Sequence, residues 1–182
     1  VDEGLKFAAA MMVGSRSELG QLRNDALKAV RLLKRTAKEW GFRPEDAVEA
    51  VIRKVEFRTP HVFREGGGGS KEQAREEWRK AKLVTKTHVD EVEGRYTNLE
   101  EAVQGLREHY WKRTLEECPM RNEDVESSVQ GTKEEVEELQ AELQEGKSVK
   151  GIMDECGDTL YGVWCYRVSK GEERLGAKAM RA

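Results

Sequence analysis

The stretch from residue 89 to residue 110 reads VDEVEGRYTNLEEAVQGLREHY, and it decides the fold that we expect. Apolar residues recur along it at alternating steps of three and four, which is the heptad pattern of a coiled-coil helix. They form a first seam of Val89, Val92, Tyr96, Leu99, Val103, Leu106 and Tyr110. Gly94 and the Thr97-Asn98 pair weaken the helix locally, and Asn98 followed by Glu101 favours a fresh helix start there.

A second seam with the same alternation follows further along the chain. It consists of Val125, Val129, Thr132, Val136, Leu139 and Leu143. Between the seams lies Cys118-Pro119-Met120, and proline cannot continue a helix. If the chain folds back on itself at this turn, each residue of the first seam from Tyr110 back to Tyr96 lies opposite a residue of the second seam, to within about one residue. The pattern therefore predicts an antiparallel, coiled-coil-like helical hairpin over residues 71–146 of an all-α helical bundle.

Such a hairpin leaves apolar surface that another element must cover: the N-terminal segment, the tail or a second copy. Residues 1–65 predict three helices, over residues 2–13, from the capping box at Ser15–Glu18 to Gly41, and from Pro44 to Thr59-Pro60. The tail, residues 147–182, is rich in aromatic residues, and its stretch 160–168 suits either a helix or a strand. Interfaces favour tyrosine and tryptophan. The candidate interface residues in the tail are Tyr161, Trp164 and Tyr166.

Residues 66–70 read GGGGS and match the flexible spacers used to join protein segments. We interpret this run as an engineered linker that replaces a loop or joins two chains. Five residues span at most about 17 Å, so the two ends that it joins should lie close together. The sequence thus predicts a three-helix segment over residues 1–65, the linker, the hairpin over residues 71–146 and the tail over residues 147–182.

The chain has 182 residues, of which 37% are charged, and a formal net charge of −3. No apolar run approaches the about 20 residues needed to span a bilayer. Asp2 and Glu3 precede the apolar stretch at residues 5–13, where a signal peptide would carry positive charge. Three cysteines cannot all pair within one chain and match no zinc spacing, so we expect a reducing, intracellular and cytoplasmic location. Because the sequence begins with Val1 rather than Met, we expect it to be part of a longer chain.

One face of the second expected helix carries the sharpest charge signal in the sequence. The basic face, as we call it, consists of Lys28, Arg31, Lys34, Arg35 and Lys38. Helical spacing aligns these residues on one side, which suits phosphates of nucleic acid or of acidic lipid headgroups. The same pattern also suits a solvated face or a dock for an acidic segment, and no interleaved aromatic residue is present for base stacking.

Residues 122–145 carry nine acidic residues and only Lys133 as a base. Such an acidic segment keeps a helix surface soluble, or it binds a basic partner such as the basic face of this chain or of a neighbouring copy.

The three histidines, His61, His88 and His109, stand at no catalytic or metal-binding spacing, and a pair of His109 with Cys118 lacks an orienting acid. We therefore predict no catalytic, metal-binding or cofactor-binding residue and no cofactor. The first hypothesis is a non-enzymatic interaction or assembly protein that self-associates through helical contacts. The alternative is a nucleic-acid-binding assembly protein, of nucleocapsid or coat type, that uses the basic face on phosphates.

Overall fold

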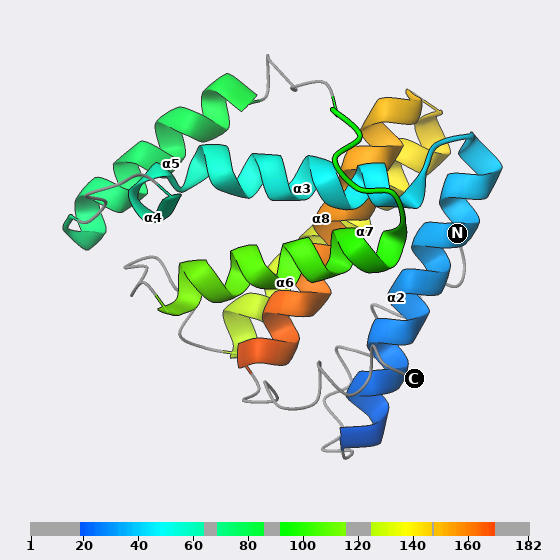
Figure 1. Cartoon of the computed structure of the whole chain (residues 1–182), viewed down its shortest axis with the longest axis horizontal. Coiled ribbons are helices and arrows are strands. Elements are labelled where there is room, and N and C mark those ends of the chain that lie inside the picture. The colour runs from blue at the N-terminus through cyan, green and yellow to red at the C-terminus, as the bar shows by residue number, and fades with distance from the viewer. Residues whose placement is uncertain (1–18, 64–68, 86–91, 116–124, 147, 170–182) are drawn as a thin grey trace. The chain divides into compact units, whose positions relative to one another are not determined.

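Every regular element in the described residues is an α-helix, which confirms the all-α prediction (Figure 1). The computed structural model describes residues 19–63, 69–85, 92–115, 125–146 and 148–169. Its helices are α2 (Leu19–Trp40), α3 (Pro44–Arg58), α4 (Pro60–Phe63), α5 (Lys71–Thr85), α6 (Leu99–Leu115), α7 (Val125–Glu145) and α8 (Val149–Ser169). None of these helices is long and apolar enough to cross a membrane. The helix expected over residues 2–13 and the capping box at Ser15–Glu18 lie outside the described residues.

The chain divides into two units. Unit 1 comprises Val1–Ala47 with Asn122–Ala182, and unit 2 comprises Val48–Arg121. The boundaries between the units fall elsewhere than the predicted segment boundaries at residues 65, 70 and 146.

The C-terminal end of α2 and the start of α3 follow the predicted signals. Gly41 has a φ of 77°, a conformation that glycine adopts without a steric penalty, and its N–H donates to the carbonyl of Ala37. Helix α3 begins at Pro44, whose fixed φ suits the first turn of a helix.

In unit 1, α8 packs against both α2 and α7. Helix α7 ends at Glu145 and α8 begins at Val149. Gly146 has a φ of 60°, and Ser148 caps α8 through a 2.9 Å hydrogen bond from the Gly151 N–H. The two helices therefore form an antiparallel hairpin. Its core residues, together with those of α2, are Ala29, Leu33, Ala37, Thr132, Val136, Leu139, Ile152, Cys156, Leu160 and Val163.

This packing shows the conformation of the tail over residues 149–169 and places part of the second seam against α8. Residues 160–168 are helical rather than extended, because they belong to α8. Of the second seam, Thr132, Val136 and Leu139 are buried and Leu143 is half-buried. The side chains of Val125 and Val129 lie outside the described residues. Because α6 belongs to unit 2 and α7 to unit 1, the predicted pairing of the two seams stays a prediction.

The first seam does not form one continuous helix. Residues 92–98 are non-helical, and α6 begins only at Leu99. Val92 and Tyr96 therefore lie in a loop, whereas Val103 and Leu106 are buried on α6. Val89 and the side chain of Tyr110 lie outside the described residues. The physical reason for the break is local, since Gly94 has a φ of 70° and Asn98 caps α6 with a 2.9 Å hydrogen bond from the Glu101 N–H.

Unit 2 surrounds the apolar side of α3. Its buried apolar residues are Val48, Val51, Ile52, Val55, Val62, Ala74, Ala102, Val103 and Leu106. Helix α5 begins with a capping pair, in which Ser70 and Gln73 each accept a hydrogen bond from the other's backbone N–H. Thus the last residue of the GGGGS run caps a helix, while residues 66–68 lie outside the described part of the chain.

The cap of α6 makes part of the stability of unit 2 depend on pH. The carboxylate of Glu101 accepts hydrogen bonds from the Thr97 backbone N–H at 2.9 Å and from the Thr97 hydroxyl at 2.7 Å. The backbone bond first, and then the hydroxyl bond, lower the pKa of Glu101. A carboxyl whose pKa is lower in the folded state stabilises the fold above its unfolded pKa, and this contribution disappears as the pH falls through the folded pKa.

We therefore expect Glu101→Gln to be less stable than the unsubstituted protein at pH 7, and the difference to shrink as the pH falls below 4.5, the ordinary pKa of a glutamate side chain. Urea unfolding at a series of pH values measures this difference. Glu100→Gln removes the same charge one residue away but leaves the hydrogen bonds between Glu101 and Thr97 in place, and it serves as the control. A difference for Glu101→Gln that stays constant across this pH series would contradict the assignment.

Candidate functional site

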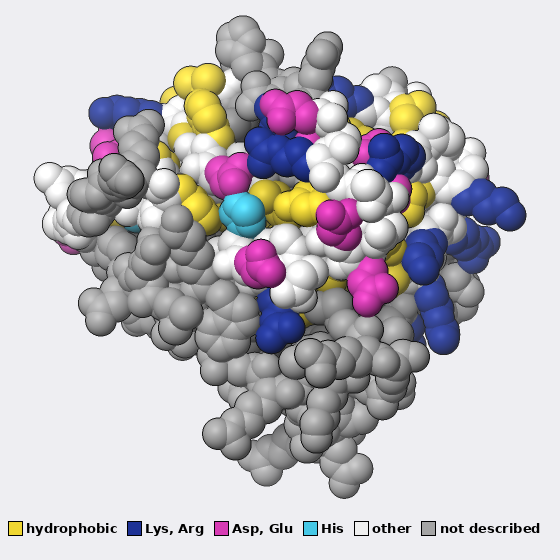
Figure 2. Space-filling model, in the orientation of Figure 1, with side chains coloured by type: hydrophobic (Ala, Val, Ile, Leu, Met, Phe, Trp, Pro, Cys, Tyr) yellow, Lys and Arg dark blue, Asp and Glu magenta, His cyan; other side chains and the backbone are white. Residues whose placement is uncertain are grey.

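The basic face of α2 is a solvent-exposed surface of unit 1. All five of its cationic side chains are exposed, while Ala29, Leu33 and Ala37 on the other side of the helix are buried. Dark blue side chains gather over α2 in Figure 2. For Arg31, Lys34 and Lys38, the described part of the chain offers no carboxylate within ion-pair distance. The structure thus brings together the side chains that the sequence predicted as phosphate contacts.

An oppositely charged surface lies on α7 of the same unit. Its members are all exposed and share one side of the helix. The acidic face, as we call it, consists of Glu134, Glu137, Glu138 and Glu145. Lys133, the one base of α7, lies 3.8 Å from the Glu137 carboxylate.

The predicted aromatic anchors lie on α8. Tyr161 and Trp164 are half-buried, and the side chain of Tyr166 lies outside the described residues. Their role at an interface stays a prediction.

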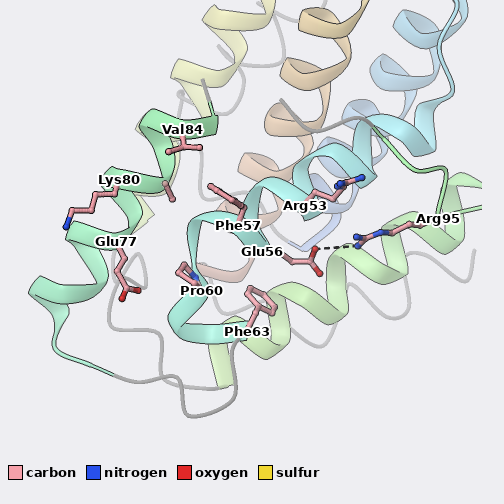
Figure 3. Close-up of a pocket in the computed structure, with 10 residues that line it drawn as sticks. Arg53, Glu56, Phe57, Pro60, Phe63, Glu77, Lys80, Val84 and Arg95 are labelled. Atoms are coloured by element: carbon pink, nitrogen blue, oxygen red, sulfur yellow. Dashed lines mark hydrogen bonds and ion pairs between the residues drawn. The ribbon is translucent and has the colours of Figure 1, made fainter. Parts of the chain in front are cut away.

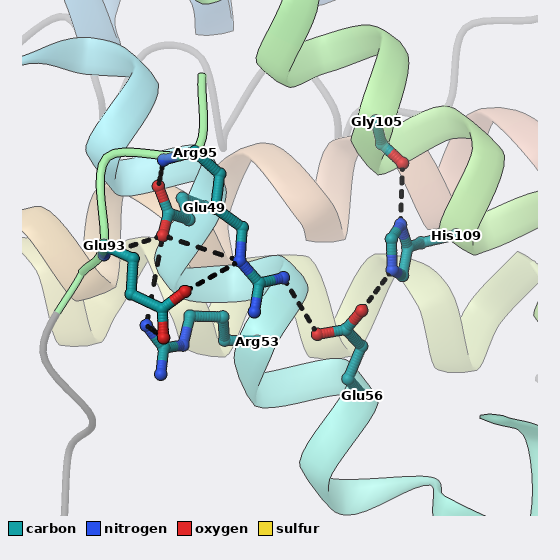
Figure 4. Close-up of polar contacts among 7 residues, drawn as sticks. All are labelled: Glu49, Arg53, Glu56, Glu93, Arg95, Gly105 and His109. Atoms are coloured by element: carbon teal, nitrogen blue, oxygen red, sulfur yellow. Dashed lines mark hydrogen bonds and ion pairs between the residues drawn. The ribbon is translucent and has the colours of Figure 1, made fainter. Parts of the chain in front are cut away.

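Unit 2 contains a polar network that sequence reasoning missed (Figure 4). Its centre is Glu49 on α3, whose side chain is 1% exposed. The two carboxylate oxygens accept hydrogen bonds from the backbone N–H groups of Glu93 at 2.8 Å and Arg95 at 2.7 Å. The guanidinium groups of Arg53 and Arg95 each lie 4.0 Å from this carboxylate. Glu49 thereby holds the loop at residues 92–95 onto α3.

Arg95 links this centre to a second carboxylate. Its guanidinium lies 3.4 Å from Glu56 and 3.4 Å from Glu93. Partial burial alone would lower the pKa of Arg95, but the two acids raise it above its ordinary value, so the guanidinium is fully charged.

His109 on α6 completes the network. Its Nδ1 lies 3.0 Å from the carbonyl oxygen of Gly105, and its Nε2 contacts the carboxylate of Glu56. Both neighbours are hydrogen-bond acceptors, so both contacts are satisfied together when the imidazole carries two protons. The ring also lies 5.4 Å from the ring of Phe63, measured between centroids. The network therefore connects α3, the loop and α6 through ion pairs and hydrogen bonds.

A groove of about 580 Å³ lies beside this network in unit 2 (Figure 3). Phe57 and Val84 on its wall are 44% and 45% exposed, which is unusual for large apolar side chains. Charged residues of both signs surround them. The lining residues are Arg53, Glu56, Phe57, Pro60, Phe63, Glu77, Lys80, Ala81, Val84 and Arg95. The groove combines an apolar wall with charged groups that are already engaged, such as Arg95 with Glu56 and Lys80 with Glu76.

Three carboxylates meet where α7 and α8 pack. Ligand oxygens of Glu135, Glu155 and Asp158 all lie within 4.8 Å of one another, and each residue is half-buried. Acidic groups gather on helix surfaces for many reasons, so this arrangement by itself identifies no ion.

Two cysteines of the described residues are free thiols. Burial raises the pKa of Cys156 to about 12, with a smaller opposing effect from its hydrogen bond with Thr36. A thiol in this state is a poor nucleophile. His88 and Cys118 lie outside the described residues, so the proposed approach of Cys118 to His109 is untested.

Comparison of the chain with protein-family models, with curated protein sequences and with solved structures finds no match in any of the three.

Proposed function

We propose that this protein is a non-enzymatic helical interaction protein that self-associates, with the basic face of α2 as its interaction surface. The observation that carries the proposal is the exposure of all five cations on a helix whose other side is buried. Their burial on an acidic element of the same copy would have supported a purely structural role. Their exposure instead supports a role toward a partner.

The arrangement of these charges adds a physical argument. Arg31 with Arg35, and Lys34 with Lys38, stand four residues apart on one helix, where like charges repel. An acidic partner relieves this repulsion and gains attraction from several cations at once. Complementary charge fixes the orientation of partners and speeds their association more than it raises affinity.

Light scattering of the unsubstituted protein over a range of concentrations, up to about 1 mM, tests the proposal because contacts between charged surfaces are weak. We expect a mass that rises with concentration, and we expect the triple substitution Arg31→Glu, Lys34→Glu and Lys38→Glu to keep the mass at that of the monomer. Glutamate is a good helix former, so α2 should remain folded, as far-UV circular dichroism will show.

Three exposed cations of α5 provide a matched control with the same change of net charge. The substitutions Arg75→Glu, Arg79→Glu and Lys80→Glu should leave the concentration dependence unchanged. A strictly monomeric unsubstituted protein, or equal effects of the two triple substitutions, would contradict the proposal.

A second candidate function, nucleic-acid binding, is favoured by the length of the basic face. From Lys28 to Lys38 it covers about 15 Å of helix, enough to contact several successive phosphates. The same light-scattering measurement with a short RNA distinguishes the two. A complex whose affinity falls steeply with salt, formed by a protein that is otherwise monomeric, supports the nucleic-acid candidate.

We further propose a reducing, cytoplasmic location. It is supported by the two free thiols of the described residues, one of them deeply buried. Mass spectrometry after alkylation of the unreduced but denatured protein, as isolated from its source, should find all three cysteines alkylated. A disulfide at any of them would overturn this location.

A further inference from the structure

We propose that the partner of the basic face is the acidic face of α7 on a second copy of this chain. This inference rests on the proposed function and names the partner surface. It follows from the placement of two opposite charged surfaces on one unit, and three observations support it.

The first observation is exposure. Both faces are accessible to solvent, and each lies on the side of its helix opposite the buried core. On α7 the buried residues Thr132, Val136 and Leu139 point toward the core, which leaves the glutamates pointing away from it. Neither face is therefore buried within its own copy.

The second observation is the match in length and charge. The basic face covers about 15 Å from Lys28 to Lys38, and the acidic face covers about 16 Å from Glu134 to Glu145. The basic face carries five positive charges, the acidic face four negative ones. Two straight helical faces of equal length and opposite sign can meet along their whole extent, with several ion pairs at once.

The third observation is the packing of the two helices that carry the faces. Helix α8 packs against both α2 and α7, so one unit presents both faces on separate helices. Each copy then offers a basic face to one neighbour and an acidic face to another. Such a contact is heterologous, or head-to-tail, and it builds rings or open chains of copies rather than stopping at a two-fold dimer.

A charge-swap experiment tests this pairing in the full chain. The first variant, Arg31→Glu with Lys34→Glu and Lys38→Glu, has two acidic faces. The second variant, Glu134→Lys with Glu137→Lys and Glu138→Lys, has two basic faces. Each variant by itself should stay monomeric under conditions where the unsubstituted protein associates. In every head-to-tail contact between its copies, the surfaces of α2 and α7 now carry charge of the same sign.

An equimolar mixture of the two variants should associate again. In the mixture the acidic α7 of the first variant meets the basic α2 of the second, and the reversed helices pair in the same way. The affinity of the two variants for each other should fall on the order of tenfold when the ionic strength is raised from about 0.1 M to about 1 M. This change shortens the Debye screening length from about 10 Å to about 3 Å. Light scattering reports the mass, and circular dichroism confirms that each variant keeps its helices.

The outcomes separate this inference from the proposed function. If the first variant loses association and the second keeps it, the basic face is an interaction surface whose partner is not α7, and only the inference is overturned. If both variants lose association and their mixture does not recover it, the inference is likewise overturned. If neither variant loses association, or the unsubstituted protein never associates, the proposed function is overturned as well.

Discussion

Replacing Glu49 by alanine is expected to lower the free energy of unfolding of unit 2 by about 3 kcal/mol. The carboxylate is buried and accepts hydrogen bonds from the backbone N–H groups of Glu93 and Arg95. Alanine removes both acceptors, and each N–H left without a partner away from water costs about 1–3 kcal/mol. The guanidinium groups of Arg53 and Arg95 also lose the attraction of the negatively charged carboxylate beside them.

Hydrogen exchange measures this loss at the atoms concerned. The amides of Glu93 and Arg95 should be protected in the unsubstituted protein and should exchange much faster in Glu49→Ala. Glu49→Gln keeps one side-chain acceptor and should fall between the two. The control Glu76→Ala breaks an exposed ion pair with Lys80 and should change the stability by about 0.5 kcal/mol or less. Equal exchange at both amides in all variants would show that Glu49 does not hold the loop.

The second large effect is expected from Gly162→Leu, which should destabilise unit 1 by about 2–3 kcal/mol. Gly162 lies where α8 comes close to the backbone of α7. A β-carbon at this position would lie 3.0 Å from the Thr132 hydroxyl oxygen and 3.2 Å from the Thr132 α-carbon. Because the α-carbon belongs to the backbone of α7, the two helices must separate to admit a leucine, and they then lose core contacts.

Gly131 of α7 provides a matched control in the same hairpin. A β-carbon there meets nothing within 4 Å, so Gly131→Ala should stabilise unit 1 by about 0.5–1 kcal/mol through helix propensity alone. Urea unfolding of the two variants and the unsubstituted protein makes the comparison. A stabilising Gly162→Leu, or a Gly162→Leu no worse than Gly131→Ala, would contradict the close approach of the two helices.

Much of the helical content was predictable from local signals. Gly41 and Pro44 marked the end of one helix and the start of the next, and Ser70 with Gln73 marked the start of α5, because these residues act within one turn of the chain. The exposed face of α2 was likewise predictable, since helical spacing alone aligns its cations.

The first seam was misjudged because its heptad spacing continues through a segment that is not helical. The steps from Val92 to Leu99 fit a coiled coil, yet Gly94 and Asn98 break the helix, and Glu49 binds the backbone of the loop. Glu49 lies 44 residues before Glu93 and 46 residues before Arg95, whose backbone amides donate hydrogen bonds to it, so no local pattern connects them. The one signal was a single acid inside the apolar stretch AVEAVI, and a buried acid needs distant partners that sequence spacing does not reveal.

The close packing of α7 on α8 escaped prediction for a different reason. Gly157 and Gly162 lower helix propensity, so residues 160–168 suited a strand as well as a helix. Contact with Thr132 makes Gly162 favourable at its position, and only the three-dimensional structure shows that contact.

The crowding of like charges on α2 and on α7 has a consequence for the response to electrolytes. Within a single copy, Arg31 repels Arg35 and Glu134 repels Glu138, so added salt screens a destabilising force and should raise the melting temperature of dilute protein. Between copies, the same ions would screen the attraction of the proposed head-to-tail contact. We therefore expect added salt to raise the melting temperature of the monomer and to dissociate the proposed assembly at salt concentrations where the helices remain folded.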